Sequence, residues 1–131
     1  MHKNSNTKIT VLAVINPSES SEKLIDAIKN LVNMDIVKNN HLLSGSSFNL
    51  TSLQIIFDQV KSKSIFSVLR RLLLNNLENN STFFLLNKQA ATVNSVVLTE
   101  NEQDSPLGTI KIIIEAKDIM EVVDSLAPES P

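Results

Sequence analysis

The chain has 131 residues, 42% of them hydrophobic, which is enough for one domain with a buried core. It contains no Cys, so disulfides and thiolate chemistry are excluded, and the net charge of -2 argues against indiscriminate nucleic-acid binding. No apolar run approaches the roughly 18 residues of a membrane span, and the start lacks a signal-peptide pattern. We expect one cytoplasmic domain over residues 1–131, ordered from about 8 to 128, with no membrane partner.

The first part of the chain predicts a strand, a helix and a bent strand. β-Branched residues dominate 8–15 and predict a strand. Ser18 is a suitable N-cap, and apolar residues at helical spacing then predict a helix over 24–32. The segments 34–38 and 41–48 are less regular, and we interpret them as a bent strand or a strand pair.

The middle of the chain predicts two helices. Asn49 or Thr51 can cap a short helix, and a longer one is predicted over 62–77. Lys63 and Arg70 are seven residues apart, so a continuous helix would place them on one ridge.

The last part predicts three strands and a helix. Residues 82–86 and 93–99 are expected to pair as a hairpin, and 108–114 reads as a central strand. Asp118 can cap a final helix that Pro128 ends. Together these elements predict an α+β fold, a two-layer sandwich with a mixed or mainly antiparallel sheet and helices on one face.

Motifs for catalysis and for metal binding are absent from the sequence. It has no Gly-rich phosphate loop, no Gly-x-Ser-x-Gly elbow and no histidine pair at metal-ligand spacing. We therefore predict a protein that is not an enzyme, with no cofactor and no catalytic or metal-binding residue.

Charge is unevenly distributed along the chain. Residues 59–99 contain five basic side chains against Glu78 alone, net +4, whereas residues 100–131 are net -6. A basic segment in an otherwise acidic protein is typical of phosphate binding, although two solvated faces of different charge are an equally simple interpretation. The candidate RNA-binding residues are Lys61, Lys63, Arg70, Arg71, Lys88 and Gln89.

Lys88 and Gln89 follow directly after a predicted strand. Either side chain could point outward to a phosphate, since Lys is a cationic donor and Gln offers a donor and an acceptor. Alternatively, Lys88 is solvated and Gln89 bonds the backbone of the hairpin. Pro106 and Gly108 are expected to shape the turn into the last strand.

Five short motifs occur in an order that resembles a known family. They are Ile15-Asn16-Pro17-Ser18-Glu19, Ile65 to Arg70, Leu86-Asn87-Lys88-Gln89-Ala90-Ala91, Ser105-Pro106-Leu107-Gly108-Thr109-Ile110 and Val123-Asp124-Ser125-Leu126-Ala127-Pro128. The chain resembles the archaeal uncharacterised protein family two-hundred-one, part of a broader RNA-binding domain family, from about Lys8 to Pro128. It departs from the family pattern at Thr109, at Ser125 and over 92–94.

The resemblance implies a compact two-layer fold similar to the ribosomal protein that carries five-S RNA, and non-enzymatic RNA binding. The scarcity of aromatic residues favours structured RNA as the partner. The alternative is a protein-interaction or scaffold domain without nucleic acid. Convergence of the basic residues on one concave face would favour RNA, and their dispersal would favour the alternative. A homodimer is also expected, because a strand-rich chain must protect its sheet edges.

Overall fold

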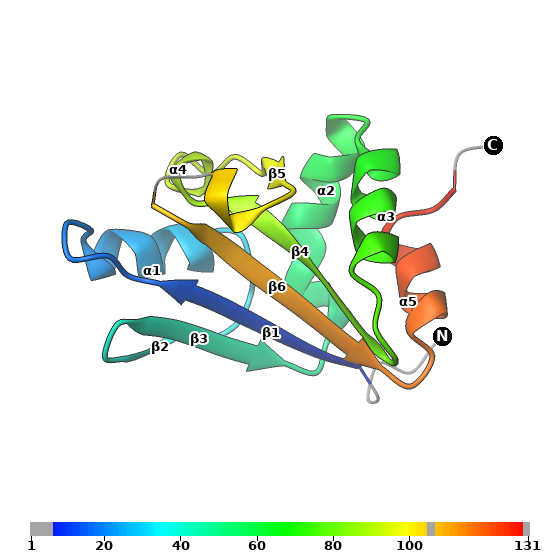
Figure 1. Ribbon diagram of the computed structural model, residues 1–131, viewed down its shortest axis with the longest axis horizontal. Coiled ribbons are helices and arrows are strands. Elements are labelled where there is room, and N and C mark those ends of the chain that lie inside the picture. Colours follow the sequence, from blue (N-terminus) through cyan, green and yellow to red (C-terminus); the bar gives the residue numbers. More distant parts are fainter. Residues whose placement is uncertain (1–6, 105–106, 130–131) are drawn as a thin grey trace.

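The computed structural model describes residues 7–104 and 107–129 (Figure 1). The strands are β1 (Thr7–Val14), β2 (Val37–Asn39), β3 (Leu42–Ser47), β4 (Ser81–Asn87), β5 (Leu98–Thr99) and β6 (Thr109–Ala116). The α-helices are α1 (Ser21–Lys29), α2 (Gln54–Ser62), α3 (Phe66–Asn75), α4 (Lys88–Ala91) and α5 (Ile119–Leu126), and the 3-10 helices are η1 (Leu50–Leu53) and η2 (Glu102–Asp104).

The strands form one six-stranded sheet in the order β2-β3-β1-β6-β4-β5. Each described pair of neighbours is antiparallel, which refines the prediction of a mixed or mainly antiparallel sheet. β6 lies between β1 and β4, where Ile112 is opposite Val11 on one side and Phe84 on the other. The central position predicted for this strand is therefore confirmed.

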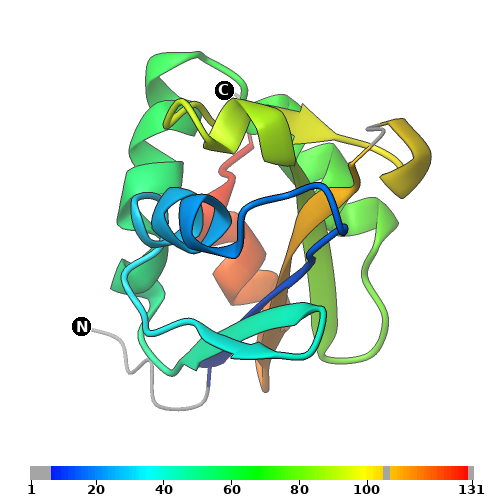
Figure 2. The same cartoon turned by 90° about the vertical axis from the view of Figure 1, so that its left-hand side faces the viewer.

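The α-helices cover one face of the sheet, as Figures 1 and 2 show, so the predicted two-layer α+β fold is confirmed. Alternate strand residues point into this layer because successive side chains of a strand point to opposite faces. Ile9, Val11, Ile112, Ile114 and Phe84 are at most 1% exposed there. They pack with buried residues of the helices, including Leu24, Ile28, Leu69, Leu73 and Val123.

Within residues 7–104 and 107–129, no α-helix lies on the other face of the sheet (Figure 1). In β1 this face presents Lys8, Thr10, Leu12 and Val14, of which Val14 is 57% exposed. We call this surface the open face.

The first helix covers residues 21–29, and its cap lies two residues later than predicted. Ser20, not Ser18, is its N-cap, and the Lys23 amide donates to Ser20 Oγ at 3.2 Å. Residues 16–19 form a closed turn instead, since the Glu19 amide donates to the Asn16 carbonyl and the Asn16 amide donates to the Glu19 carboxylate. The hydrogen bonds between Asn16 and Glu19 hold residues 16–19 in this turn, so the helix starts only after it.

The helix predicted over 62–77 is present, but it is shorter and begins later than predicted. α2 ends in a Schellman motif in which the Ile65 amide donates to the Val60 carbonyl at 3.0 Å and the Ser64 amide to the Lys61 carbonyl at 3.1 Å. Ser64 has φ of 58°, a left-handed conformation that ends the helix, and α3 starts at Phe66.

The strand predicted over 93–99 is mostly wrong, although the pairing with β4 is right. Asn87 caps α4 by accepting from the Ala90 amide at 2.8 Å, and Asn94 turns the chain with φ of 61°. Within residues 93–99, only the two residues of β5 pair with β4. The Asn49 and Asp118 caps are confirmed, and Gly108 has φ of 92°, which favours glycine. Pro106 lies outside the described residues.

Candidate nucleic-acid interface

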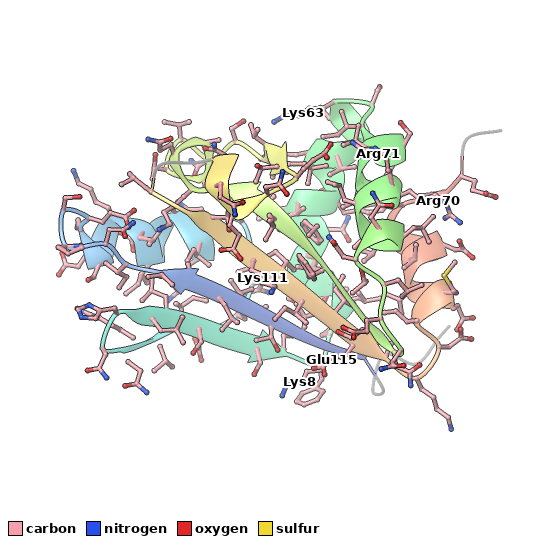
Figure 3. The ribbon with its side chains drawn as sticks, viewed as in Figure 1. Lys8, Lys63, Arg70, Arg71, Lys111 and Glu115 are labelled. Carbon is pink, nitrogen blue, oxygen red and sulfur yellow. The ribbon has the colours of Figure 1, made fainter. Side chains whose placement is uncertain are left out.

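The structure separates the six predicted contact residues, and this dispersal by itself favours the interaction-domain alternative. Lys61, Lys63, Arg71 and Gln89 are exposed, Arg70 is partly buried and Lys88 is buried. The predicted ridge of Lys63 and Arg70 is wrong, because Lys63 is the C-cap of α2 and therefore not part of the helix that carries Arg70. Figure 3 shows Lys63 near the α2 end and Arg70 beside α5.

Lys63 holds the loop that follows α4. Its ammonium donates to the Val96 carbonyl at 2.7 Å and to Ser95 Oγ at 3.0 Å. Gln59, one turn earlier in α2, donates to the Asn94 carbonyl and accepts from the Val96 amide. These bonds leave one ammonium hydrogen of Lys63 for a ligand, since Lys has three.

Arg71 lies near the other end of the same segment. Its guanidinium is 2.9 Å from the Glu100 carboxylate, and the two side chains are 48% and 57% exposed. A pair this exposed contributes about 0–1 kcal/mol, so a phosphate can compete for the arginine. Residues 95–100 therefore run from Lys63 to Arg71, roughly 16 Å if extended. We call Lys61, Lys63 and Arg71, the exposed basic residues of segment 59–99, the cationic strip.

Arg70 faces the C-terminal helix. Its side chain is 15% exposed, and Nη1 donates to the Asp124 carboxylate at 2.8 Å and to the Ala127 carbonyl at 3.0 Å. A hollow of about 500 Å³ lies beside it, lined also by Arg71, Leu74 and Glu129. Arg70 thus connects α3 to the end of α5 and has an acidic partner already.

Replacing Arg70 with Ala is expected to lower the free energy of unfolding by about 1.5–3 kcal/mol, the usual range for hydrogen bonds to a charged group. The loss arises because the Ala127 carbonyl, in a buried residue, loses its donor. Urea unfolding followed by circular dichroism measures it. Arg71→Ala is the control and should change stability by less than about 1 kcal/mol; equal effects of the two substitutions would contradict this interpretation.

Both interpretations of Lys88 are wrong, because its side chain is neither solvated nor directed to a ligand. It is 1% exposed. Its ammonium donates to the Val14 carbonyl at 2.5 Å, the Leu107 carbonyl at 2.7 Å and Glu19 Oε1 at 3.0 Å, which uses all three hydrogens. Asn16 Nδ2 reaches the Leu107 carbonyl and Glu19 as well. We call this cluster the Lys88 hub.

Gln89 is exposed on α4. This helix is part of the connection between β4 and β5, where the backbone of a hairpin was expected. The Gln89 backbone carbonyl accepts from Thr92 Oγ1 at 2.6 Å. Of Lys88 and Gln89, only Gln89 has a side chain that is exposed to solvent.

The sequence interpretation did not select three charged residues that lie on the open face: Lys8, Lys111 and Glu115 (Figure 3). Lys111 places its ammonium 4.3 Å from the centroid of the Phe83 ring, a cation–π contact. The available signal was the alternation Lys111, Ile113, Glu115 within an otherwise apolar strand, which marks one side as accessible to water.

Within residues 7–104 and 107–129, no group of three or more His, Asp or Glu side chains could hold a metal ion. Over the same part of the chain, no helix has the length and apolar character needed to cross a membrane.

Comparison with known proteins decides the family. A family model described as RNA binding matches residues 8–116. A UPF0201 protein of Sulfurisphaera tokodaii is 36% identical over 129 residues, covering 95% of this chain and 89% of that protein. A UPF0201 protein of Sulfolobus acidocaldarius is 34% identical over the same length. The chain belongs to the UPF0201 family.

Solved UPF0201 structures have the same fold. The crystal structure of a UPF0201 protein from Methanococcus jannaschii has a TM-score of 0.76 at 27% identity and covers 95% of both chains. Another UPF0201 crystal structure has a TM-score of 0.81 at 23% identity, covering 94% of both chains. The family resemblance predicted from the five motifs is confirmed. The similarity to the ribosomal protein that carries five-S RNA stays a prediction.

Proposed function

We propose that this UPF0201 protein is a non-enzymatic RNA-binding module that contacts phosphates through the cationic strip. The observation that carries the proposal is the match of the RNA-binding family model to residues 8–116, most of the chain. The strip is the part of the basic segment that remains accessible once Lys88 and Arg70 are assigned to internal contacts.

The strip suits phosphate binding for electrostatic reasons. Lys61 is exposed and has no ion pair among the described residues, and Lys63 donates only to uncharged acceptors. Arg71 has a single exposed acidic partner. Each cation that meets a phosphate releases condensed counterions, which favours binding at low salt.

Structured RNA is the expected class of ligand. The exposed aromatic surface is small, since the protein has five Phe and no Trp or Tyr, so stacking of single-stranded bases contributes little. Backbone contacts to a folded RNA depend less on aromatic side chains. Gln89, exposed on the neighbouring α4, adds a donor and an acceptor for sugar or phosphate groups.

The variant Lys61→Ala, Lys63→Ala, Arg71→Ala tests the proposal. Three phosphate contacts predict a salt slope of about 2 to 3, and the variant should bring the slope close to zero and weaken binding of a stem–loop RNA at least about tenfold at low salt. Filter binding or fluorescence anisotropy across a salt series measures both quantities.

The matched control is Lys23→Ala, Lys29→Ala, Lys38→Ala, three exposed lysines that give the same change in net charge. It should retain both the affinity and the salt slope of the wild type. Equal losses in the two triple variants, or no RNA affinity in the wild type at low salt, would refute the cationic strip as the contact surface.

A further inference from the structure

The open face exposes apolar side chains on adjacent strands. Val14 is 57%, Val37 61% and Leu42 39% exposed. The register makes Val14 a direct neighbour of Leu42 and places Leu12 opposite Ser44, which is opposite Val37. A contiguous exposed apolar surface of this kind commonly marks an interaction site.

The edges of the sheet do not require a partner. β2 has three residues and β5 has two, and edge strands this short offer few free backbone groups for pairing. Protection of the sheet edges is therefore a weak reason to expect a homodimer. A contact between faces is the arrangement that the exposed side chains favour.

Two opposite charges flank the centre of the open face. Lys111 and Glu115 point to this side of β6 with Ile113 between them (Figure 3). Among the described residues neither forms an ion pair, and the Lys111 ammonium lies over the Phe83 ring. Glu115 also borders a hollow of about 770 Å³, which leaves space beside its carboxylate.

From these observations we infer that a second copy of this chain docks on the open face, with Lys111 of each copy paired to Glu115 of the other. A twofold axis between the two sheets, perpendicular to β6 and passing over Ile113, reverses the strand direction and brings these residues opposite each other. Packed sheets lie about 10 Å apart, a gap that extended Lys and Glu side chains can bridge together.

The charge pattern selects this orientation. An axis parallel to β6 would place Lys111 opposite Lys111 and Glu115 opposite Glu115, and such like-charge contacts are strongly unfavourable. Because the twofold contact is isologous, the same two residues supply both ion pairs, and Ile113 meets its own copy at the centre.

RNA is the less suitable occupant of this face. Glu115 would repel phosphates, and the Phe83 ring already has Lys111 over it, so it offers no free stacking surface. The apolar neighbours Leu12, Val14 and Leu42 have no donor or charge with which to bind a phosphate. Lys111 and Glu115, on either side of Ile113, are complementary to the same pair on a second copy, and Lys8, opposite Glu115 on β1, is a second cation on this face.

Charge exchange tests the dimer directly. Lys111→Glu and Glu115→Lys each create two like-charge contacts, so each variant alone should raise the dimer dissociation constant by about tenfold or more. The mixture of the two variants should form a heterodimer, since one chain then offers two acids and the other two lysines. The double variant K111E/E115K should dimerise like the wild type.

Sedimentation velocity over a concentration series measures these masses, with urea unfolding to establish that each variant is folded. Lys117→Glu, which changes a charge just beyond the end of β6, is the control and should leave the dimer intact. A wild type that is monomeric at the highest concentration, single variants that dimerise normally, or a mixture without heterodimer would overturn the proposal. Loss of RNA binding in a monomeric K111E variant, with wild type also monomeric, would assign the face to RNA instead.

Discussion

Replacing Lys88 with Met is expected to lower the free energy of unfolding by about 3–5 kcal/mol, the cost of removing one partner from a buried ion pair. Met preserves most of the aliphatic stem but donates no hydrogen bond. The substitution leaves the Glu19 carboxylate without its cation and the carbonyls of Val14 and Leu107 without this donor. Urea unfolding followed by circular dichroism measures the loss.

The control is Lys61→Met, the same chemical change at an exposed position. It should alter stability by less than about 0.5 kcal/mol, as is usual for surface substitutions. The double variant with Glu19→Gln should be less destabilised than the sum of the single changes, because the two residues are in direct contact. An effect of Lys88→Met no larger than that of Lys61→Met would show that the Lys88 hub does not stabilise the fold.

The Lys88 hub gives a structural reason for three of the motifs by which the chain resembles its family. Glu19 comes from the first motif, Lys88 from the third and Leu107 from the fourth, and their polar atoms meet at one ammonium. The hub joins the end of β1, the start of α4 and the loop before β6. These motif residues therefore act in folding, and under the proposed function contact with RNA falls to other side chains.

The central strands could be predicted because their residues carry a strong local signal. β1, β4 and β6 are rich in β-branched and aromatic residues, and the run 110–114 is typical of a strand with neighbours on both sides. The position of the break between α2 and α3 could not be predicted in this way. It depends on a left-handed Ser64, and only Gly or Asn at that position would have signalled it.

The exposure of each basic side chain was harder to predict than the fold. A charge count treats Lys61 and Lys88 alike, yet one is exposed and the other is 1% exposed. The difference arises from tertiary contacts with Glu19 and Leu107, which are distant in sequence. Arg70 is similar, since its partners on α5 lie more than 50 residues away. Composition cannot distinguish internal cations from free ones.

Replacing Phe84 with Ala is expected to lower the free energy of unfolding by about 3–5 kcal/mol, the range for removing a buried aromatic side chain. Phe84 is 1% exposed and lies on the helix-covered face, opposite Ile112 of β6. The cost combines lost transfer of the ring from water with the cavity that remains. Phe48→Ala is the matched control, because Phe48 is 60% exposed and its removal should change stability by less than about 0.5 kcal/mol.

Phe83→Ala adds a comparison within the same strand. Phe83 points to the open face and is only partly buried, so at low protein concentration its removal should cost about 1 kcal/mol. A second copy docked on that face stabilises the folded chain by mass action, so the cost of Phe83→Ala should then rise with protein concentration. The cost of Phe84→Ala should not depend on concentration in this way. Equal costs for the two substitutions at every concentration would contradict the assignment of one covered and one open face.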